Sequence, residues 1–331
     1  MKTLSSIPSI GRFRSWVLIV NLLALSLLTS CSSSSSSNSS TPDAEQESLE
    51  GKVFVLGAQI DAFGTLVLYA IGTDLDGNAL KVAELKTASV TVGGVSYNIK
   101  DDAELTITKV GDSDKILSLG LLTDYSNSTK FDVDLAADLL ALILDSIPLV
   151  YEAQVMTFSN ELETHLTWSE DLLAIQAAVL VEHSDSDDTA LYDSMGIALE
   201  GDMVTEGLVE RCRPAHMLVM FTDGHDNLSS VYDQFGIETI VNNDQTVVIV
   251  LGTNSANSNV LTTLAGDFGA VVQVSDPDAI EAEVNKWAKS LKNMVKITLD
   301  SSINATGKNV SITIGSQTVK VSPNTHCTLP P

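Results

Sequence analysis

The sequence predicts an α/β protein: a doubly wound, mostly parallel sheet flanked by helices, joined to a small β-sandwich module. Between about residues 114 and 294, apolar strands alternate with amphipathic helices, a pattern typical of a parallel sheet covered by helices on both faces. On either side, at residues 51–113 and 295–331, apolar and polar residues alternate as they do in antiparallel strands. With 331 residues, 44% of them hydrophobic, the chain can bury a sizeable core.

Residues 1–30 have the features of a signal peptide. Lys2, Arg12 and Arg14 precede the apolar run WVLIVNLLALSLL, which is too short to span a bilayer comfortably. The run leads into LLTSC, which resembles a bacterial lipobox, and this resemblance implies that Cys31 becomes the lipidated first residue of the mature chain. A plain transmembrane anchor is the alternative. The small residues before Cys31 and the serine-rich sequence after it favour the lipoprotein.

The expected location is the bacterial cell envelope, with attachment by lipid alone. Two or more acyl chains, such as palmitate, anchor a protein stably without a spanning helix. Ser32 follows the lipidated cysteine, which resembles the outer-membrane address of enterobacterial lipoproteins, and both the cell surface and the periplasmic face remain open. Residues 31–50 contain almost no apolar side chains and are expected to form a tether.

The chain is strongly acidic, and this restricts its partners. The formal net charge is −25, and removal of residues 1–30 makes it −28, because three basic residues and no acidic ones are lost. Nucleic acids and anionic lipids carry the same sign of charge and are therefore not expected as partners. Cations and basic protein surfaces are compatible with it. The acidity is equally consistent with a role only in solubility.

The two flanking β segments resemble each other. ASVTVGGVSYNI places Gly93 and Gly94 where a two-residue hairpin turn is expected, and NVSITIGSQTVKV alternates on both sides of Gly315 and Ser316. VKITLD adds one further short strand. Each segment alone is too small for a stable core. We therefore expect N-terminal and C-terminal strands to form one sandwich, from whose loops the middle domain emerges.

Oxygen-bearing side chains follow the strands of the middle region, where open α/β sheets bind their ligands. Asp124, Ser126 and Ser128 form a D-x-S-x-S arrangement, Thr189 precedes a helix in DDTALYDS, and Asp223 lies in TDG after an apolar strand. These motifs and their separations of 65 and 34 residues resemble the metal ion-dependent adhesion site of von Willebrand factor A domains. The resemblance covers roughly 180 residues. It implies a Rossmann-type fold, a divalent cation held by these five residues, and a protein ligand.

The chemistry of these residue types agrees with that implication. A hard ion such as Mg²⁺ prefers oxygen ligands, and Ca²⁺ and Mn²⁺ accept the same class. Serine and threonine hydroxyls can coordinate without adding charge, while Asp124 and Asp223 balance the ion. An open position could then accept a carboxylate from a partner. The alternative is that serine and aspartate simply stabilise turns and helix N-termini, but three matching elements at three strand or loop ends favour the metal site.

Neighbouring residues are candidates for the rim of the ligand site. Tyr125 lies inside the first motif, and His225 and Asp226 follow Asp223. Tyr125 could instead pack beneath the site, and His225 and Asp226 could belong to a loop or a helix cap. The acidic loop 183–188 could tune ion affinity or contact a basic partner, or it could simply be solvated.

Three cysteines are present, and Cys31 is assigned to lipid. In an exported protein Cys212 and Cys327 can form a disulfide, which would attach the C-terminal tail to the domain. Two separate thiols are the alternative. Cys212 precedes the strand that leads to Asp223, so it is expected at the end of the domain opposite the metal.

The sequence favours a binding protein over an enzyme. It contains no H-E-x-x-H, no G-x-x-x-x-G-K-[ST] and no G-x-S-x-G, and its five histidines lack metal-ligand spacing. A hydrolase could use an open Mg²⁺ site, but no general base is evident beside it. The expected function is adhesion or protein–protein interaction through a divalent cation. The alternative is a structural or assembly lipoprotein that holds another envelope protein, with the metal mainly stabilising the domain.

Overall fold

The computed structural model defines a folded unit whose strands and helices lie between residues 53 and 321. The signal peptide, the tether, Cys31, Cys327 and the apolar stretch 131–147 lie outside the described residues. The structure describes residues 52–60, 64–74, 78–81, 85, 88–98, 105–111, 114, 116–129, 150–181, 186–202, 206–253, 255–274, 277–314 and 317–323. Among these residues, no helix has the length and apolar character needed to cross a membrane.

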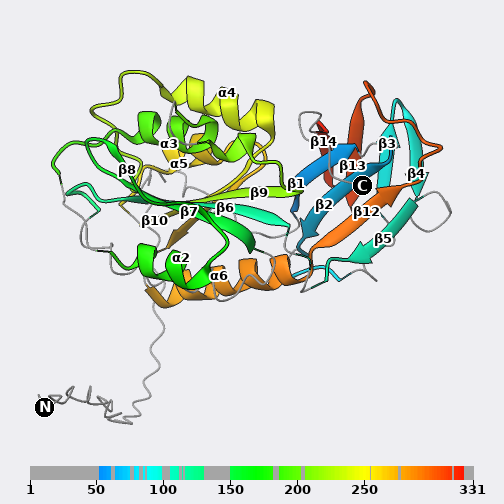
Figure 1. The fold of residues 1–331 in the computed structure, drawn as a ribbon, viewed down its shortest axis with the longest axis horizontal. Coiled ribbons are helices and arrows are strands. Elements are labelled where there is room, and N and C mark those ends of the chain that lie inside the picture. Colours follow the sequence, from blue (N-terminus) through cyan, green and yellow to red (C-terminus); the bar gives the residue numbers. More distant parts are fainter. Residues whose placement is uncertain are drawn as a thin grey trace, which may run out of the picture. The chain divides into compact units, whose positions relative to one another are not determined.

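A six-stranded sheet forms the centre of the α/β part (Figure 1). Neighbouring strands are parallel except β8, which runs antiparallel at one edge. The middle strands are continuous apolar runs because helices cover both faces. In spatial order the strands are β11 (Ala270–Val274), β10 (Val247–Thr253), β9 (Ala215–Phe221), β6 (Leu117–Asp124), β7 (Val150–Phe158) and β8 (Leu162–Ser169).

Helices pack on both faces of this sheet, as the sequence predicts. One face carries α3 (Leu191–Glu200), α4 (Gln234–Asp244) and α5 (Ser258–Ala265), which share a core with β6, β7, β9 and β10. The other face carries α2 (Leu172–Val179) and α6 (Pro277–Lys292) over a second core. The doubly wound fold class is therefore confirmed.

The order of the strands creates a topological switch point at one edge of the sheet. From β6 the chain continues to β7 and β8 on one side, and it returns on the other side of β6 as β9. The carboxyl ends of β6 and β9 are consequently neighbours from which the chain departs in opposite directions. Ligands of such sheets bind at this point. Asp124 ends β6, and Asp223 follows β9 by two residues.

The flanking strands form two four-stranded antiparallel sheets. The first has the order β1 (Val53–Ile60), β2 (Leu66–Gly72), β12 (Val295–Leu299), β5 (Leu105–Lys109), and the second has β14 (Gln317–Val321), β13 (Val310–Ile314), β3 (Ser89–Val92), β4 (Val95–Asn98). Both sheets contribute to one apolar core, as Leu68, Val90, Ile297 and Ile312 illustrate. The predicted sandwich of N-terminal and C-terminal strands is confirmed.

The predicted hairpin turn between β3 and β4 is also confirmed. Val92 pairs with Val95, and both intervening glycines have positive φ, +59° at Gly93 and +88° at Gly94. Two consecutive positive φ angles are what a tight hairpin turn of this type requires, and glycine adopts them without steric cost.

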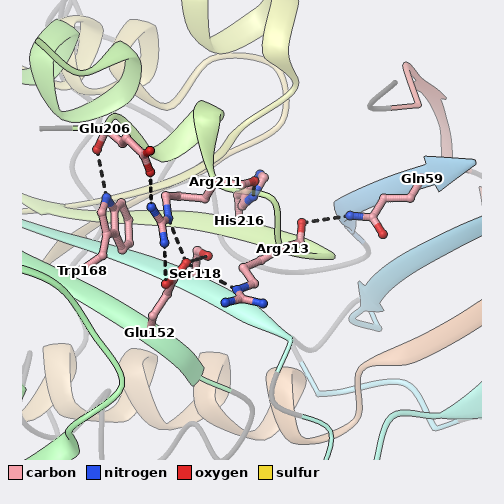
Figure 2. Close-up of polar contacts among 8 residues, drawn as sticks. All are labelled: Gln59, Ser118, Glu152, Trp168, Glu206, Arg211, Arg213 and His216. Carbon is pink, nitrogen blue, oxygen red and sulfur yellow. Dashed lines mark hydrogen bonds and ion pairs between the residues drawn. The ribbon is translucent and has the colours of Figure 1, made fainter. Parts of the chain in front are cut away.

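Strand β1 connects the sandwich to the amino-terminal edge of the α/β sheet. Its register shifts at Gly57, where a side chain would place its Cβ only 1.7 Å from the carbonyl oxygen of Pro214. The side chain of Gln59 donates a hydrogen bond of 3.0 Å to the carbonyl of Arg213 (Figure 2). Glycine at position 57 therefore allows β1 to approach the segment that precedes β9.

An ion-pair network around the buried Glu152 holds that segment in place (Figure 2). The carboxylate of Glu152 accepts hydrogen bonds from Arg211 Nε at 2.9 Å and Nη2 at 2.7 Å, and from Ser118 Oγ at 2.8 Å. Arg211 also pairs with Glu206, and its guanidinium lies over the ring of Trp168. Burial alone would raise the pKa of Glu152, but the hydrogen bonds and charge of Arg211 hold this pKa below its usual value. Arg211 therefore binds Glu152 through two hydrogen bonds, and this pairing offsets the cost of burying the carboxylate.

His216 lies beside this network at the start of β9. Its Nε2 is 2.7 Å from the carbonyl oxygen of Arg211. Burial lowers the pKa of His216 to about 4, against the opposing effects of the Arg211 hydrogen bond and the Glu152 charge. The folded protein therefore keeps this imidazole neutral at pH values where an unfolded chain would protonate it.

This arrangement predicts a loss of stability in mild acid. Above pH 6.5 neither state is protonated at His216, whereas between pH 6.5 and about 4 only the unfolded chain takes up the proton. The free energy of unfolding should therefore decrease as the pH falls from 6.5 to about 4. Urea denaturation at pH 7 and pH 5 should show a smaller decrease for His216→Gln, which can still donate to Arg211. An equal decrease in both proteins would contradict the assignment.

Candidate metal site

Asp124 occupies the last position of the central strand β6, and its side chain is fully buried at 0% exposure. Oδ1 accepts the N–H of Ser126 at 2.9 Å, and Oδ2 accepts the hydroxyl of Thr222 at 2.7 Å. Burial raises the pKa of Asp124 to about 6, opposed by the hydrogen bonds from Ser126 and Thr222 and supported by the charge of Asp223. A buried carboxylate with neutral donors is thus fixed at the switch point of the sheet.

The turn after β6 holds the two predicted serine ligands close together. Ser126 Oγ lies 3.1 Å from Ser128 Oγ, and Ser126 is buried. Thr129 fastens the turn, because its hydroxyl donates to the carbonyls of Asp124 and Ser126, both at 2.9 Å. The N–H of Asn127 binds the carbonyl of Ser186 at 2.9 Å and so connects the turn to the loop that leads to Thr189.

Thr189 is buried and lies just before α3. Its N–H donates to Asn227 Oδ1 at 2.7 Å. Its carbonyl accepts the N–H groups of Asn227 at 3.0 Å and Leu228 at 3.1 Å. The loop that carries Thr189 is therefore bound to the loop that follows Asp223.

Asp223 lies after β9 and is also buried. Its Oδ1 accepts the N–H of His225 at 2.9 Å, and its carbonyl accepts the N–H of Asn257 at 2.9 Å. The preceding residue, Thr222, donates its hydroxyl to Asp124. Hydrogen bonds therefore link the loops that carry all five predicted ligands at the carboxyl edge of the sheet.

The residues present fit a hard divalent cation. Two neighbouring buried carboxylates repel each other, as the effect of Asp223 on the pKa of Asp124 shows. Among the described residues, no lysine, arginine or histidine forms an ion pair with either one. Nor do these residues include a group of three or more His, Cys, Asp or Glu side chains placed to hold a metal ion. A cation here would therefore depend on hydroxyl ligands beside two carboxylates, which is oxygen chemistry suited to Mg²⁺, Ca²⁺ or Mn²⁺.

The predicted rim residues occupy different environments. His225 is exposed and Tyr125 is half-buried at the same edge. Asp226 accepts the N–H of Leu191 at 2.9 Å and the hydroxyl of Ser229 at 2.6 Å, so it caps the first turn of α3. Its carboxylate therefore has an internal role in addition to any contact at the rim.

The supporting residues were not singled out by the sequence. Thr222 and Thr129 position Asp124, while Asn227 positions Thr189. The only signal for Thr222 was its place directly before Asp223 in TDG. From the predicted acidic loop, Asp187 accepts a hydrogen bond from the side chain of Asn127.

Cys212 is disulfide-bonded. Because Cys327 lies outside the described residues, the pairing with Cys327 stays a prediction. Cys212 precedes β9, and with Gln59, Arg213 and His216 it lines a cavity of about 780 Å³ at the amino edge of the sheet. None of the five predicted metal ligands lines this cavity, which the sequence did not anticipate.

No family model matches the chain, and no curated protein matches it either. It is similar to solved structures of low identity. Proximal thread matrix protein 1 from the mussel byssus is 17% identical over 57% of this chain and 49% of that one, with a TM-score of 0.46. A von Willebrand factor type A protein from Catenulispora acidiphila is 10% identical over 83% and 69%, with a TM-score of 0.46. BatB, a conserved hypothetical protein from Bacteroides thetaiotaomicron, is 17% identical over 53% and 100%, with a TM-score of 0.37.

The chain spans about half the length of the mussel protein. One structure of that protein has a zinc-occupied metal ion-dependent adhesion motif.

Removal of the Thr222 hydroxyl should destabilise the site without changing its shape. Thr222→Val leaves one oxygen of the buried Asp124 without its donor, which should lower the free energy of unfolding by about 1–3 kcal/mol. Urea denaturation in EDTA measures this effect in the absence of metal. As a control, Thr239→Val alters an exposed hydroxyl on α4 and should change stability little. Equal stability of the Thr222 variant and the parent would contradict the role assigned to this hydrogen bond.

Proposed function

We propose that this chain is a von Willebrand factor A-like lipoprotein of the cell envelope that binds a protein ligand through a divalent cation. The cation is held at the carboxyl edge of the α/β sheet by Asp124, Ser126, Ser128, Thr189 and Asp223. The activity is adhesion or protein–protein interaction, not catalysis. Lipid on Cys31 attaches the protein to the outer membrane.

One observation carries the proposal: the buried carboxylate of Asp124 at the switch point of the sheet, which forms no ion pair with a cationic side chain of the described residues. It is fully buried, its pKa is raised by burial, and Asp223 lies close enough to raise this pKa further. Proteins rarely bury a charge without a partner, because desolvation costs several kcal/mol per ion. A divalent cation between these residues would offset that cost.

Each residue has a separate task in this proposal. Asp124 and Asp223 supply negative charge, while the three hydroxyls supply neutral oxygen ligands. When bound, the cation supplies a Lewis-acidic position that can accept a carboxylate from the partner. The hydrogen bonds among the loops keep the five side chains in place, which reduces the ordering required on binding. Mg²⁺ is the proposed ion, and Ca²⁺ and Mn²⁺ would use the same ligands.

The metal site is tested by calorimetric titration of Mg²⁺ into the chain and its variants. We expect saturable binding to one site, and we expect Asp124→Asn and Thr189→Ala to reduce the affinity at least tenfold. Far-ultraviolet circular dichroism should stay nearly unchanged. Thr239→Ala, the same exchange on the exposed face of α4, serves as the control. If both site variants bind Mg²⁺ as tightly as the parent, these residues do not form the site.

EDTA separates the proposed function from the structural alternative. If the metal serves partner binding, its removal should abolish that binding while the fold survives. If the metal mainly stabilises the domain, its removal should unfold the chain.

The lipid anchor has its own measurement. Mass spectrometry of the mature N-terminus should find an acylated Cys31. An N-terminus that retains residues 1–30 would exclude the lipoprotein assignment.

A further inference from the structure

The cavity at the amino edge of the α/β sheet is separate from the candidate metal site. Its walls are the end of β1, the segment that precedes β9, the end of α4 and the end of β14. Its volume of about 780 Å³ lies within the usual range of about 300–1,000 Å³ for small-ligand sites. The polar groups of the lining therefore determine which class of ligand fits.

A buried carbonyl oxygen in this lining lacks a hydrogen-bond donor. Gln59 is only 2% exposed, and its Oε1 has no hydrogen-bond partner among the described residues. Its Nε2 donates to the carbonyl of Arg213 at 3.0 Å (Figure 2), which fixes the orientation of the amide. A buried acceptor without a donor is unfavourable. A ligand that donates an N–H to Gln59 would satisfy it.

His216 adds a second acceptor to the same lining. Its Nε2 lies 2.7 Å from the carbonyl oxygen of Arg211, and because a carbonyl can only accept, Nε2 carries the proton. Burial lowers the pKa of His216 to about 4, so the ring is neutral at pH 7 and its Nδ1 is an acceptor. Two neutral acceptors, from Gln59 and His216, thus belong to one cavity.

The charged groups of the lining are mostly acidic. Arg213 is the one basic side chain among the described lining residues that is charged at pH 7, and it lies 3.7 Å from the buried Glu152, which holds its charge toward the protein interior. The carboxylate of Glu210 is exposed and has no hydrogen-bond or ion-pair partner in the described part of the chain. The lining therefore attracts cations and repels anions. Its four carboxylates are those of Glu200, Glu206, Glu210 and Asp244.

Two walls of the cavity are bonded to each other. The side-chain amide of Gln245 donates to Ser322 Oγ at 3.2 Å and accepts the N–H of Ser322 at 2.6 Å. These hydrogen bonds join the end of α4 to the residue after β14. Walls that are already ordered reduce the entropic cost of binding a ligand.

We propose that this cavity is a second binding site, which takes an organic cation with N–H donors, an alkylammonium or guanidinium group. Gln59 and His216 accept hydrogen bonds from the cation, and Glu210 attracts its charge. A bare metal ion fits less well, because the described residues include no group of three or more His, Cys, Asp or Glu side chains placed to hold one. The cation belongs either to a free amine or to a basic side chain of a partner. This inference is independent of the proposed metal site.

Small cations test the inference with the full chain. Isothermal calorimetry compares n-butylammonium and n-butylguanidinium with n-butanol, which has the same alkyl chain and no charge. We expect saturable binding to one site for at least one of the cations and no binding of butanol. Asp124→Asn should bind the cation as the parent does, because the metal site lies outside the cavity.

Variants identify the groups responsible. Gln59→Met keeps the length of the side chain but removes the acceptor, which should weaken binding about tenfold, the effect of losing a hydrogen bond to a charged group. Glu210→Gln removes an exposed charge and should weaken binding roughly two- to fivefold. Glu238→Gln makes the same exchange on the exposed face of α4, outside the lining, and should have no effect. Circular dichroism should be unchanged in all three variants.

A blocked Gly-Arg-Gly peptide and its citrulline analogue distinguish the two sources of the cation. If the arginine peptide binds more tightly than n-butylguanidinium and the citrulline peptide does not bind, the cation belongs to a partner protein. If the free cations bind and the arginine peptide does not, the ligand is a small amine or guanidine.

Three results would overturn the inference: neither cation binds, butanol binds as tightly as the cations, or both Gln59→Met and Glu210→Gln bind like the parent. Loss of cation binding in Asp124→Asn would also overturn it, because the cation would then occupy the metal edge. Mg²⁺ titration is a separate measurement, so the proposed function stands or fails independently.

Discussion

The arrangement of the loops at the carboxyl edge of the sheet depends on the buried carboxylate of Asp124. It ends the central strand, and it receives an N–H from the next turn and a hydroxyl from the neighbouring strand end. These donors stabilise the charge only in part, because the pKa of Asp124 remains raised. The turn 125–129, the loop before α3 and the loop after β9 are then bonded to one another around it. The result is a hydrogen-bonded edge whose two carboxylates form no ion pair within the described part of the chain, an arrangement that favours a cation.

At the amino-terminal edge of the same sheet, the carboxylate of Glu152 is paired within the protein. Glu152 is almost as buried as Asp124, but Arg211 binds it with two hydrogen bonds and Arg213 lies 3.7 Å away. Its pKa is lowered, whereas that of Asp124 is raised. Within one sheet, therefore, one buried carboxylate is paired inside the protein and serves the fold. The other has no internal cation among the described residues and is the better candidate for function.

Reciprocal hydrogen bonds also join α3 to the segment after β9. Asp226 accepts the N–H of Leu191 at the start of α3, and Asp193 of α3 accepts the N–H groups of Ser230, Val231 and Tyr232. The loop that carries Thr189 is consequently hydrogen-bonded to the segment after β9 both directly and through α3.

Sequence periodicity by itself determined the architecture, because strands buried on both faces must be continuously apolar and strands of a sandwich must alternate. The motifs in the sequence also indicated oxygen-bearing side chains at the ends of β6 and β9 and glycines in the turn of the first hairpin. The periodicity did not identify β8, whose sequence LETHLTWS mixes polar and apolar residues as an edge strand can. Only the tertiary structure decided which carboxylates are buried and which are paired. Burial and pairing depend on residues far apart in the chain, such as Asp124 and Thr222, 98 positions apart, whose contact no local pattern encodes.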